Sequence, residues 1–149
     1  MEDSLMVSEP IATALAQAQE WLRPSLESAQ APESLDYELN LIVEEILVNI
    51  LTHGLAGADN NTVEIRRRLE DNTLWLEFRD CGQPFDPLSV PAPDLDTDIE
   101  HRPLGGLGIH LVKQLADELH YVRQNNLNCL RIGKKLTEPD TTSPKTINE

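Results

Sequence analysis

The sequence predicts an α+β fold, a two-layer sandwich in which helices pack on one face of a mostly antiparallel sheet. Helical periodicity appears in three separate segments, and strand-like alternation appears in two pairs of segments, each joined by a short polar turn. A chain of 149 residues that is 40% hydrophobic suffices for one domain with one core. Because only 4% of the residues are aromatic, that core must be mainly aliphatic.

Residues 1–33 are expected to form an N-terminal helical segment of the same domain. A hydroxyl, an acid and a proline at positions 8–10 are typical of a helix start, and residues 11–28 are rich in Ala, Leu, Gln and Glu. Pro24 lies inside this helix and is able to kink or divide it. Apolar side chains recur at helical spacing at Leu15, Ala18, Leu22 and Leu26.

The core of the domain is expected over residues 34–136. Ser34 is a candidate cap for a second helix, which reaches about Thr52 and stops at the His-Gly pair that follows. Its apolar residues form one continuous arc at 100° per residue. Members of this arc are Leu35, Leu39, Ile42, Val43, Ile46, Leu47 and Ile50.

Two antiparallel hairpins are expected, the first from alternation along both of its strands and the second from two strand-like segments that flank a polar turn. The first has strands at 63–69 and 74–79 around an Asp-Asn turn, and the second has strands at 121–123 and 127–132 around an Asn-Asn turn. Short polar pairs between alternating segments are typical of tight turns that reverse the chain. The two hairpins together supply the predicted sheet.

Between the hairpins lie a long loop and a third helix. Five prolines and no sustained periodicity occur from Cys81 to Leu104, which predicts a lid over residues 83–104. An amphipathic helix is then expected over residues 109–119. Beyond the second hairpin, the polar residues 137–149 are expected to form a disordered tail.

The charge of the chain limits its partners. A formal charge of −14 repels phosphate backbones, so direct binding to nucleic acid is not expected. No apolar segment approaches the roughly 20 residues that span a bilayer, and no secretory signal begins the chain. Cys81 and Cys129 match no metal spacing and are expected to be reduced thiols. A cytoplasmic protein without a membrane partner is therefore expected.

Two polar residues lie at the border of the apolar arc of the second helix. Asn49 projects within about 20° of Ile42 and Glu45 within about 60°. One interpretation is that both are satisfied by neighbouring backbone groups or solvent; the other is that they face a cleft, where an amide oxygen binds a cation and a carboxylate takes a proton. His53 continues the same edge, either as a helix cap or as a ligand contact.

Asp80 and Gly82 come at the end of the strand that precedes the lid. Asp-x-Gly is a common turn sequence, and a turn is one interpretation. The other is that the carboxylate accepts a hydrogen bond from the amino group of a purine, while the glycine leaves room for the ring.

A glycine cluster precedes the third helix and has the sequence Gly105-Gly106-Leu107-Gly108. Exposed N–H groups at a helix N-terminus suit phosphate oxygens, although hinges use the same residues. The cluster is neither a P-loop, which ends in Gly-Lys-Ser/Thr, nor a Rossmann turn, which follows a strand. Its place after an Asn/Glu helix and an Asp-x-Gly strand end favours a nucleotide site.

These motifs in this order resemble the GHKL ATPase superfamily, which has the Bergerat fold, and within it the anti-sigma factor serine kinases. The resemblance covers about residues 35–136. The helix motif matches in residues 45–54, the strand-end motif in 80–87 and the glycine motif in 105–112. A threonine often found near the last strands of these ATPases has no clear counterpart at Asn128 or Cys129.

The resemblance implies a role for each matching residue. Asn49 would coordinate the Mg²⁺ that bridges the phosphates of ATP, and Glu45 would be the general base. Asp80 would hold the adenine amino group, with Gly82 beside the ring. The remaining contacts to the nucleotide are implied for His53, Gly105, Gly106, Leu107 and Gly108.

The resemblance also implies a function. The chain would be an ATP-dependent protein serine/threonine kinase that phosphorylates an anti-sigma factor antagonist and also binds a sigma factor, with a homodimer as an open question. A nucleotide-binding partner-switching module without catalysis is the alternative. A histidine kinase fragment is disfavoured, because no helix with a phospho-accepting histidine precedes the domain. Each of these functions requires that Glu45 and Asn49 face Asp80 and the backbone amides before Ile109 across one cavity.

Overall fold

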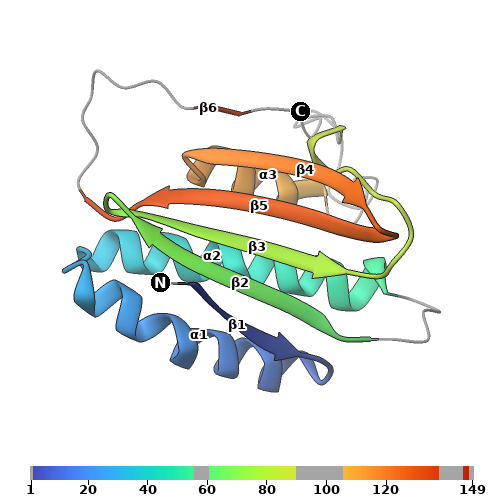
Figure 1. Ribbon diagram of the computed structural model, residues 1–149, viewed down its shortest axis with the longest axis horizontal. Helices are drawn as coiled ribbons and strands as arrows, with labels where there is room; N and C mark the ends of the chain where they lie inside the picture. The colour runs from blue at the N-terminus through green and yellow to red at the C-terminus, as the bar shows by residue number, and fades with distance from the viewer. Residues whose placement is uncertain (1, 56–60, 90–105, 138–145, 148–149) are drawn as a thin grey trace.

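The computed structural model describes residues 2–55, 61–89, 106–137 and 146–147, and its elements are labelled in Figure 1. They occur in the order β1 (Glu2–Val7), α1 (Ile11–Ser28), α2 (Glu33–Asn49), a π-helical turn η1 (Ile50–Gly54), β2 (Val63–Glu70), β3 (Thr73–Asp80), a 3₁₀ turn η2 (Pro87–Ser89), α3 (Gly106–Leu115), β4 (Glu118–Gln124), β5 (Leu127–Lys135) and β6 (Thr146–Ile147).

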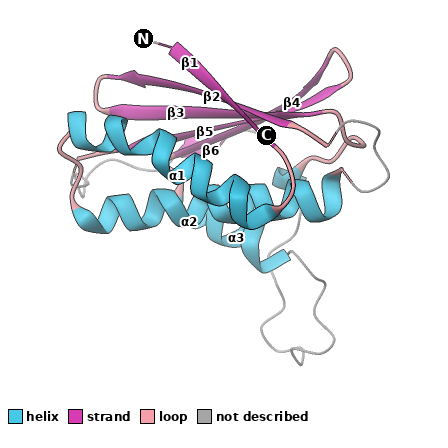
Figure 2. Cartoon of the chain, turned by 90° about the horizontal axis from the view of Figure 1, so that it is seen from below, coloured by secondary structure: helices cyan, strands magenta, loops and turns pink. Residues whose placement is uncertain are grey.

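The strands form one sheet in the order β1-β2-β3-β5-β4-β6. All neighbouring pairs are antiparallel except β4 and β6, which are parallel. The helices α1, α2 and α3 lie together on one face of the sheet (Figure 2). This arrangement confirms the predicted α+β sandwich with a mostly antiparallel sheet.

The hydrophobic core lies between the helices and the inner face of the sheet. The whole predicted arc of α2 is buried, and so are the inward-facing residues of β3. The two turns of the hairpins, Asp71-Asn72 and Asn125-Asn126, have positive φ at both positions. Such turns match the twist of the strands, which is why Asn and Asp occupy them. Central core members are Leu39, Ile42, Ile46, Leu74, Leu76, Phe78 and Ile132.

The N-terminal segment differs from its prediction, because residues 2–7 form a strand rather than part of a helical segment. β1 pairs with β2 over its whole length, from Glu2 opposite Arg68 to Val7 opposite Val63. Six residues give too short an alternation to identify a strand, and this pairing partner is about sixty residues distant in the chain. α1 follows as expected and runs through Pro24 without being divided.

Two helix boundaries also differ. Pro32 rather than Ser34 occupies the N-cap position of α2, so Ser34 lies within the first turn. The third helix was expected over residues 109–119, but α3 ends at Leu115. Asp117 N then donates to Gly133 O, and β4 begins at the next residue. Leu119 is buried as expected, although from a strand, because its spacing from Leu115 fits both periodicities.

The lid and the tail are only partly described. Within the predicted lid the structure describes residues 83–89, including η2, whereas residues 90–104 lie outside the described residues. In the tail, which was expected to be disordered, Thr146–Ile147 forms β6 beside β4; residues 138–145 and 148–149 are outside the description. The domain boundaries at 33 and 136 stay a prediction.

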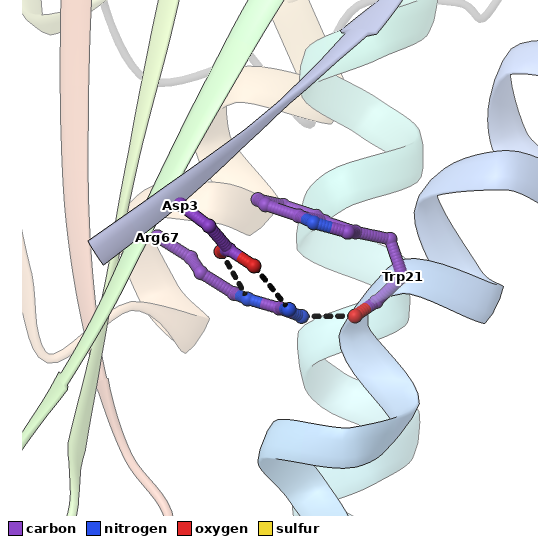
Figure 3. A network of polar contacts seen from close by, with 3 residues as sticks. All are labelled: Asp3, Trp21 and Arg67. Carbon is purple, nitrogen blue, oxygen red and sulfur yellow. Dashed lines mark hydrogen bonds and ion pairs between the residues drawn. The ribbon is translucent and has the colours of Figure 1, made fainter. Parts of the chain in front are cut away.

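An arginine joins the first two strands to α1 (Figure 3). Arg67 Nε donates to Asp3 Oδ1 at 2.6 Å and Arg67 Nη2 to Asp3 Oδ2 at 2.7 Å, a bidentate pair. Its Nη1 donates to the carbonyl of Trp21, and the guanidinium lies 4.3 Å from the centre of the indole ring. This network attaches β1 and α1 to β2.

A lysine lies buried beneath α2 and α3. Lys134 is 5% exposed, and its Nζ donates to Glu38 Oε2 and to the Leu115 carbonyl, both at 2.7 Å. The ammonium thus satisfies one of the last carbonyls of α3 and pairs with an acid of α2. It connects both helices to β5.

Glu38→Ala is expected to destabilise the domain by about 2 kcal/mol, because it leaves the Lys134 ammonium buried without its counter-charge. Lys134→Met is expected to cost less, since Met retains the apolar stem and Glu38 reaches solvent. Urea unfolding of both variants measures this. Equal costs, or a larger cost for Lys134→Met, would contradict the account.

No helix in the described part of the chain combines the length and apolar character needed to cross a bilayer.

Candidate functional site

A cleft opens between the C-terminal half of α2, the end of β3 and the start of α3. Asn49, Asp80 and Ile109 all line it, so the structure brings together the three motifs that the sequence singled out. The rest of the lining is Ile46, Ile50, Gly54, Phe85, Pro87, Tyr121, Asn128 and Leu130. The cleft therefore has largely apolar walls with a few polar groups, as small-molecule sites generally have.

The cleft adjoins a second hollow, which shares Asn49, Gly54 and Phe85 with it. His53, Gln83 and Pro84 complete the lining of this hollow. His53 is exposed on η1, one helical turn beyond Asn49, so it borders the opening rather than the apolar interior. This hollow therefore continues the cleft past Asn49.

Glu45 contacts the first turn of α3. It is half-buried, and a Cβ at position 108 would lie only 2.3 Å from Glu45 Oε2. Gly108 is thus the residue that leaves space for the carboxylate. The absence of a side chain there places an acid of α2 directly beside the N-terminus of α3.

The glycine cluster does not precede α3 entirely, as was expected. Gly106, Leu107 and Gly108 form the first turn of the helix, and Gly105 lies outside the described residues. The N–H groups of a first helical turn have no partner within the helix. The N–H groups of residues 106–108 therefore belong to the helix rather than to a loop before it, and their role as phosphate donors stays a prediction.

Asp80 is 5% exposed at the end of β3. Its Oδ1 accepts two hydrogen bonds, from Gly82 N at 2.9 Å and from Asn128 Nδ2 at 3.1 Å. The carboxylate also lines the cleft. Its orientation is therefore fixed by groups behind it, and it is available to a ligand in front.

Gly82 has a structural reason to be glycine that sequence reasoning did not find. A Cβ at this position would lie 2.1 Å from the carbonyl oxygen of Gly54. The turn after β3 thus packs backbone to backbone against the end of η1, and this contact closes one side of the cleft. Its predicted role of leaving room for a purine ring stays a prediction.

Three polar residues of the site were not identified from the sequence. Asn128 is 7% exposed and bonds Asp80, and Tyr121 OH donates to Asn128 Oδ1 at 2.5 Å. Arg123 Nη1 donates to the Gly82 carbonyl at 2.8 Å. A signal was present in β5, where Asn128 is a polar residue in an inward-facing series that continues with Leu130 and Ile132. Which residues of β5 face inward is known only from the register of β3 and β5.

The cysteines take no part in the cleft. Cys129 is a buried thiol, and burial, together with the nearby acids Glu77 and Asp80, raises its pKa. That thiol is therefore protonated at neutral pH. The described residues contain no cluster of three or more His, Cys, Asp or Glu side chains able to hold a metal. A cation here would depend on amide oxygens and on the ligand's own oxygens.

The fold and the cleft define a class of protein: two-layer α+β domains whose site lies between a polar helix edge, an aspartate at a strand end and a helix N-terminus. Residues 9–134 match the histidine kinase-like ATPase domain. The chain belongs to this family. The match begins before α1 and ends within β5.

Several curated proteins are similar to the chain. It is 25% identical to the serine/threonine-protein kinase BtrW of Bordetella bronchiseptica, over 81% of this chain and 85% of that protein. It is 28% identical to an anti-sigma F factor of Bacillus licheniformis, over 70% and 89% respectively. It is 25% identical to the serine-protein kinase RsbW of Listeria monocytogenes, over 65% and 67%.

Proposed function

We propose that the chain is an ATP-dependent protein serine/threonine kinase that acts as an anti-sigma regulator. Its substrate would be a serine or threonine hydroxyl of an anti-sigma factor antagonist, and a sigma factor would be its other partner. The observation that carries this proposal is the place of Glu45 and Asn49. Both lie on one edge of α2, with Asn49 in the cleft and Glu45 against the first turn of α3.

The cleft suits ATP in two parts. The apolar interior around Asp80 fits a base, whose amino group would donate to the carboxylate. The N–H groups of the first turn of α3 fit phosphate oxygens, because the helix dipole favours negative charge there. Backbone donors explain how a chain with a charge of −14 would bind a polyanion.

Mg²⁺ fits the donors that are present. Asn49 offers an amide oxygen at the cleft, and a magnesium ion bound mainly by phosphates and water needs only one or two protein ligands. When bound, the ion neutralises charge on the transferred phosphoryl group. Asn49 would hold the ion, and the described residues offer no larger cage.

Glu45 would accept the proton of the attacking hydroxyl. Its carboxylate lies beside the N-terminus of α3, where the phosphates are proposed to bind, and it is half-buried. A general base must reach the hydroxyl proton directly or through one water molecule. The neighbouring Glu44 is exposed and lies off the apolar arc, so it supplies a matched control.

Incubation of the purified chain with γ-labelled ATP, magnesium and an anti-sigma factor antagonist tests the proposal. Label is expected on the antagonist and is expected to disappear when its acceptor serine is replaced by alanine. ATP binding without any labelled antagonist would contradict the kinase and favour a non-catalytic nucleotide-binding module. Absence of ATP binding would contradict both.

Gly108→Ala is expected to separate activity from stability. The new Cβ would displace the end of the flexible Glu45 side chain and would cost little folding energy, because alanine favours a helix by up to about 1 kcal/mol over glycine. Phosphoryl transfer is expected to fall by about tenfold or more, since the general base moves. Thermal unfolding and the transfer assay measure the two effects; full activity in Gly108→Ala would contradict the role of Glu45.

A further inference from the structure

Asn128 is a buried polar residue on the helix-covered face of β5. It lies directly opposite Asp80 in the register of β3 and β5. The inward residues that follow it on the strand, Leu130 and Ile132, are apolar and buried. An amide in such a position destabilises the fold unless its hydrogen bonds are made.

All four hydrogen-bonding positions of the Asn128 amide are used. Nδ2 donates to Asp80 Oδ1 at 3.1 Å and to the Gln83 carbonyl at 2.9 Å. Oδ1 accepts from Tyr121 OH at 2.5 Å and from Phe85 N at 3.3 Å. An asparagine amide has two donor hydrogens and two acceptor lone pairs. Its orientation is therefore fixed, because a flip would break all four bonds.

This amide determines which oxygen of Asp80 is free. Oδ1 already accepts from Asn128 Nδ2 and Gly82 N. No described residue donates to Oδ2, and the carboxylate lines the cleft. The two hydrogen bonds to Oδ1 thus orient the carboxylate and leave Oδ2 as a free acceptor. A ligand that donates a hydrogen bond to Oδ2 is favoured.

We propose that Asn128, held by Tyr121, is a positioning residue that makes the cleft select a purine with an exocyclic amino group. This inference rests on the proposed ATP site and explains how that site would select adenine. The amino group of adenine donates to the free carboxylate oxygen. Inosine triphosphate carries a carbonyl oxygen at the same place, and two acceptors facing one another repel.

The test compares the affinities of ATP and inosine triphosphate by calorimetry. The wild type is expected to prefer ATP by about tenfold or more, the effect of one or two polar contacts. In Asn128→Leu the carboxylate loses its second anchor, and the preference is expected to fall below about threefold. Asn61→Leu, at an exposed position before β2, is the matched control and is expected to retain the preference.

Tyr121→Phe is a second variant that retains the ring and removes only the donor to Asn128 Oδ1. A smaller loss of preference, about twofold to fivefold, is expected. An unchanged ratio in both variants would overturn the inference and leave the ATP site intact. A wild type that binds neither nucleotide would overturn the proposed function and the inference together.

Asn128→Asp adds a readout that a purely structural role would not change. The new carboxylate would face Asp80, with Tyr121 and Arg123 on β4 and Cys129 on β5 as its titratable neighbours. When two carboxylates are adjacent, the pair loses its second proton with a raised apparent pKa. Below that pKa the shared proton replaces an amide hydrogen toward Asp80; above it the two charges repel.

ATP affinity of Asn128→Asp is therefore expected to fall at least tenfold as pH rises from about 5.5 to 8, relative to the wild type. Asn128→Leu is expected to show no such added dependence on pH. Parallel pH profiles for Asn128→Asp and the wild type would overturn the positioning role, because the amide would then have no connection to the carboxylate that holds the base.

Discussion

Glu45→Gln is expected to reduce phosphoryl transfer by about three orders of magnitude, since general bases contribute roughly 10²–10⁴-fold to rate. Glutamine has the same shape and fits the space that Gly108 leaves, so the cleft is retained. ATP affinity is expected to stay within about threefold, because the proposed contact of the carboxylate is with the attacking hydroxyl and not with the adenine. Single-turnover transfer and ATP calorimetry measure the two quantities.

The control for this prediction is Glu44→Gln. It removes the same charge one residue earlier, at an exposed position on α2. Transfer by this variant is expected to equal that of the wild type. If Glu45→Gln retained more than a tenth of wild-type transfer, or if Glu44→Gln were equally impaired, the assignment of Glu45 as general base would be wrong.

Gly82→Ala is expected to cost about 3 kcal/mol of folding free energy, the upper part of the range for overpacking. Its Cβ would lie 2.1 Å from the Gly54 carbonyl oxygen and 2.9 Å from Asp80 Oδ1. The carbonyl of Gly54 belongs to the backbone and cannot move aside as the end of a flexible side chain can. The turn after β3 or the end of η1 must therefore shift. For a domain of this size the midpoint of thermal unfolding is expected to fall by about 10 °C.

Gly54→Ala is the matched control from the other side of the same contact. A Cβ at position 54 would have its nearest neighbours at 3.9 Å, an ordinary contact distance. Its stability is expected to stay within about 1 kcal/mol of the wild type. Equal melting points for Gly82→Ala and the wild type would show that the two backbones are not in contact in solution.

The parts of the fold that the sequence predicted well are those with strong local periodicity. The apolar arc of α2 is continuous over four turns, and it is buried as expected. The hairpins also were predictable, because paired Asn and Asp residues adopt the positive φ angles that tight turns require. Where one short-range pattern determined an element, its type was predicted correctly, although the ends of the helices were not.

The structure differs from the prediction where contacts between residues distant in the sequence determine the element. β1 exists because it pairs with β2, and nothing in its six residues indicates a strand strongly. Leu119 fits the periodicity of both a helix and a strand, and the pairing of β4 with β5, which begins at Glu118, places it in a strand. The place of Asn128 opposite Asp80 is a property of strand register, which no local spacing contains.

The candidate site follows the same rule. Asn49, Asp80 and the start of α3 were predicted from motif order, and the structure brings them to one cleft. The contacts that shape the cleft were not predictable. Gly82 against Gly54, Gly108 against Glu45 and Asn128 against Asp80 each join residues that are far apart in the sequence.

ATP is expected to bind between α2 and α3 with a magnesium ion held by Asn49. Titration calorimetry of the wild type and Asn49→Ala, each with ATP in excess magnesium and in excess EDTA, tests it most directly. The wild type is expected to bind ATP about tenfold or more tightly with magnesium, and Asn49→Ala is expected to lose that difference. Equal affinity of the wild type in magnesium and in EDTA would contradict the claim.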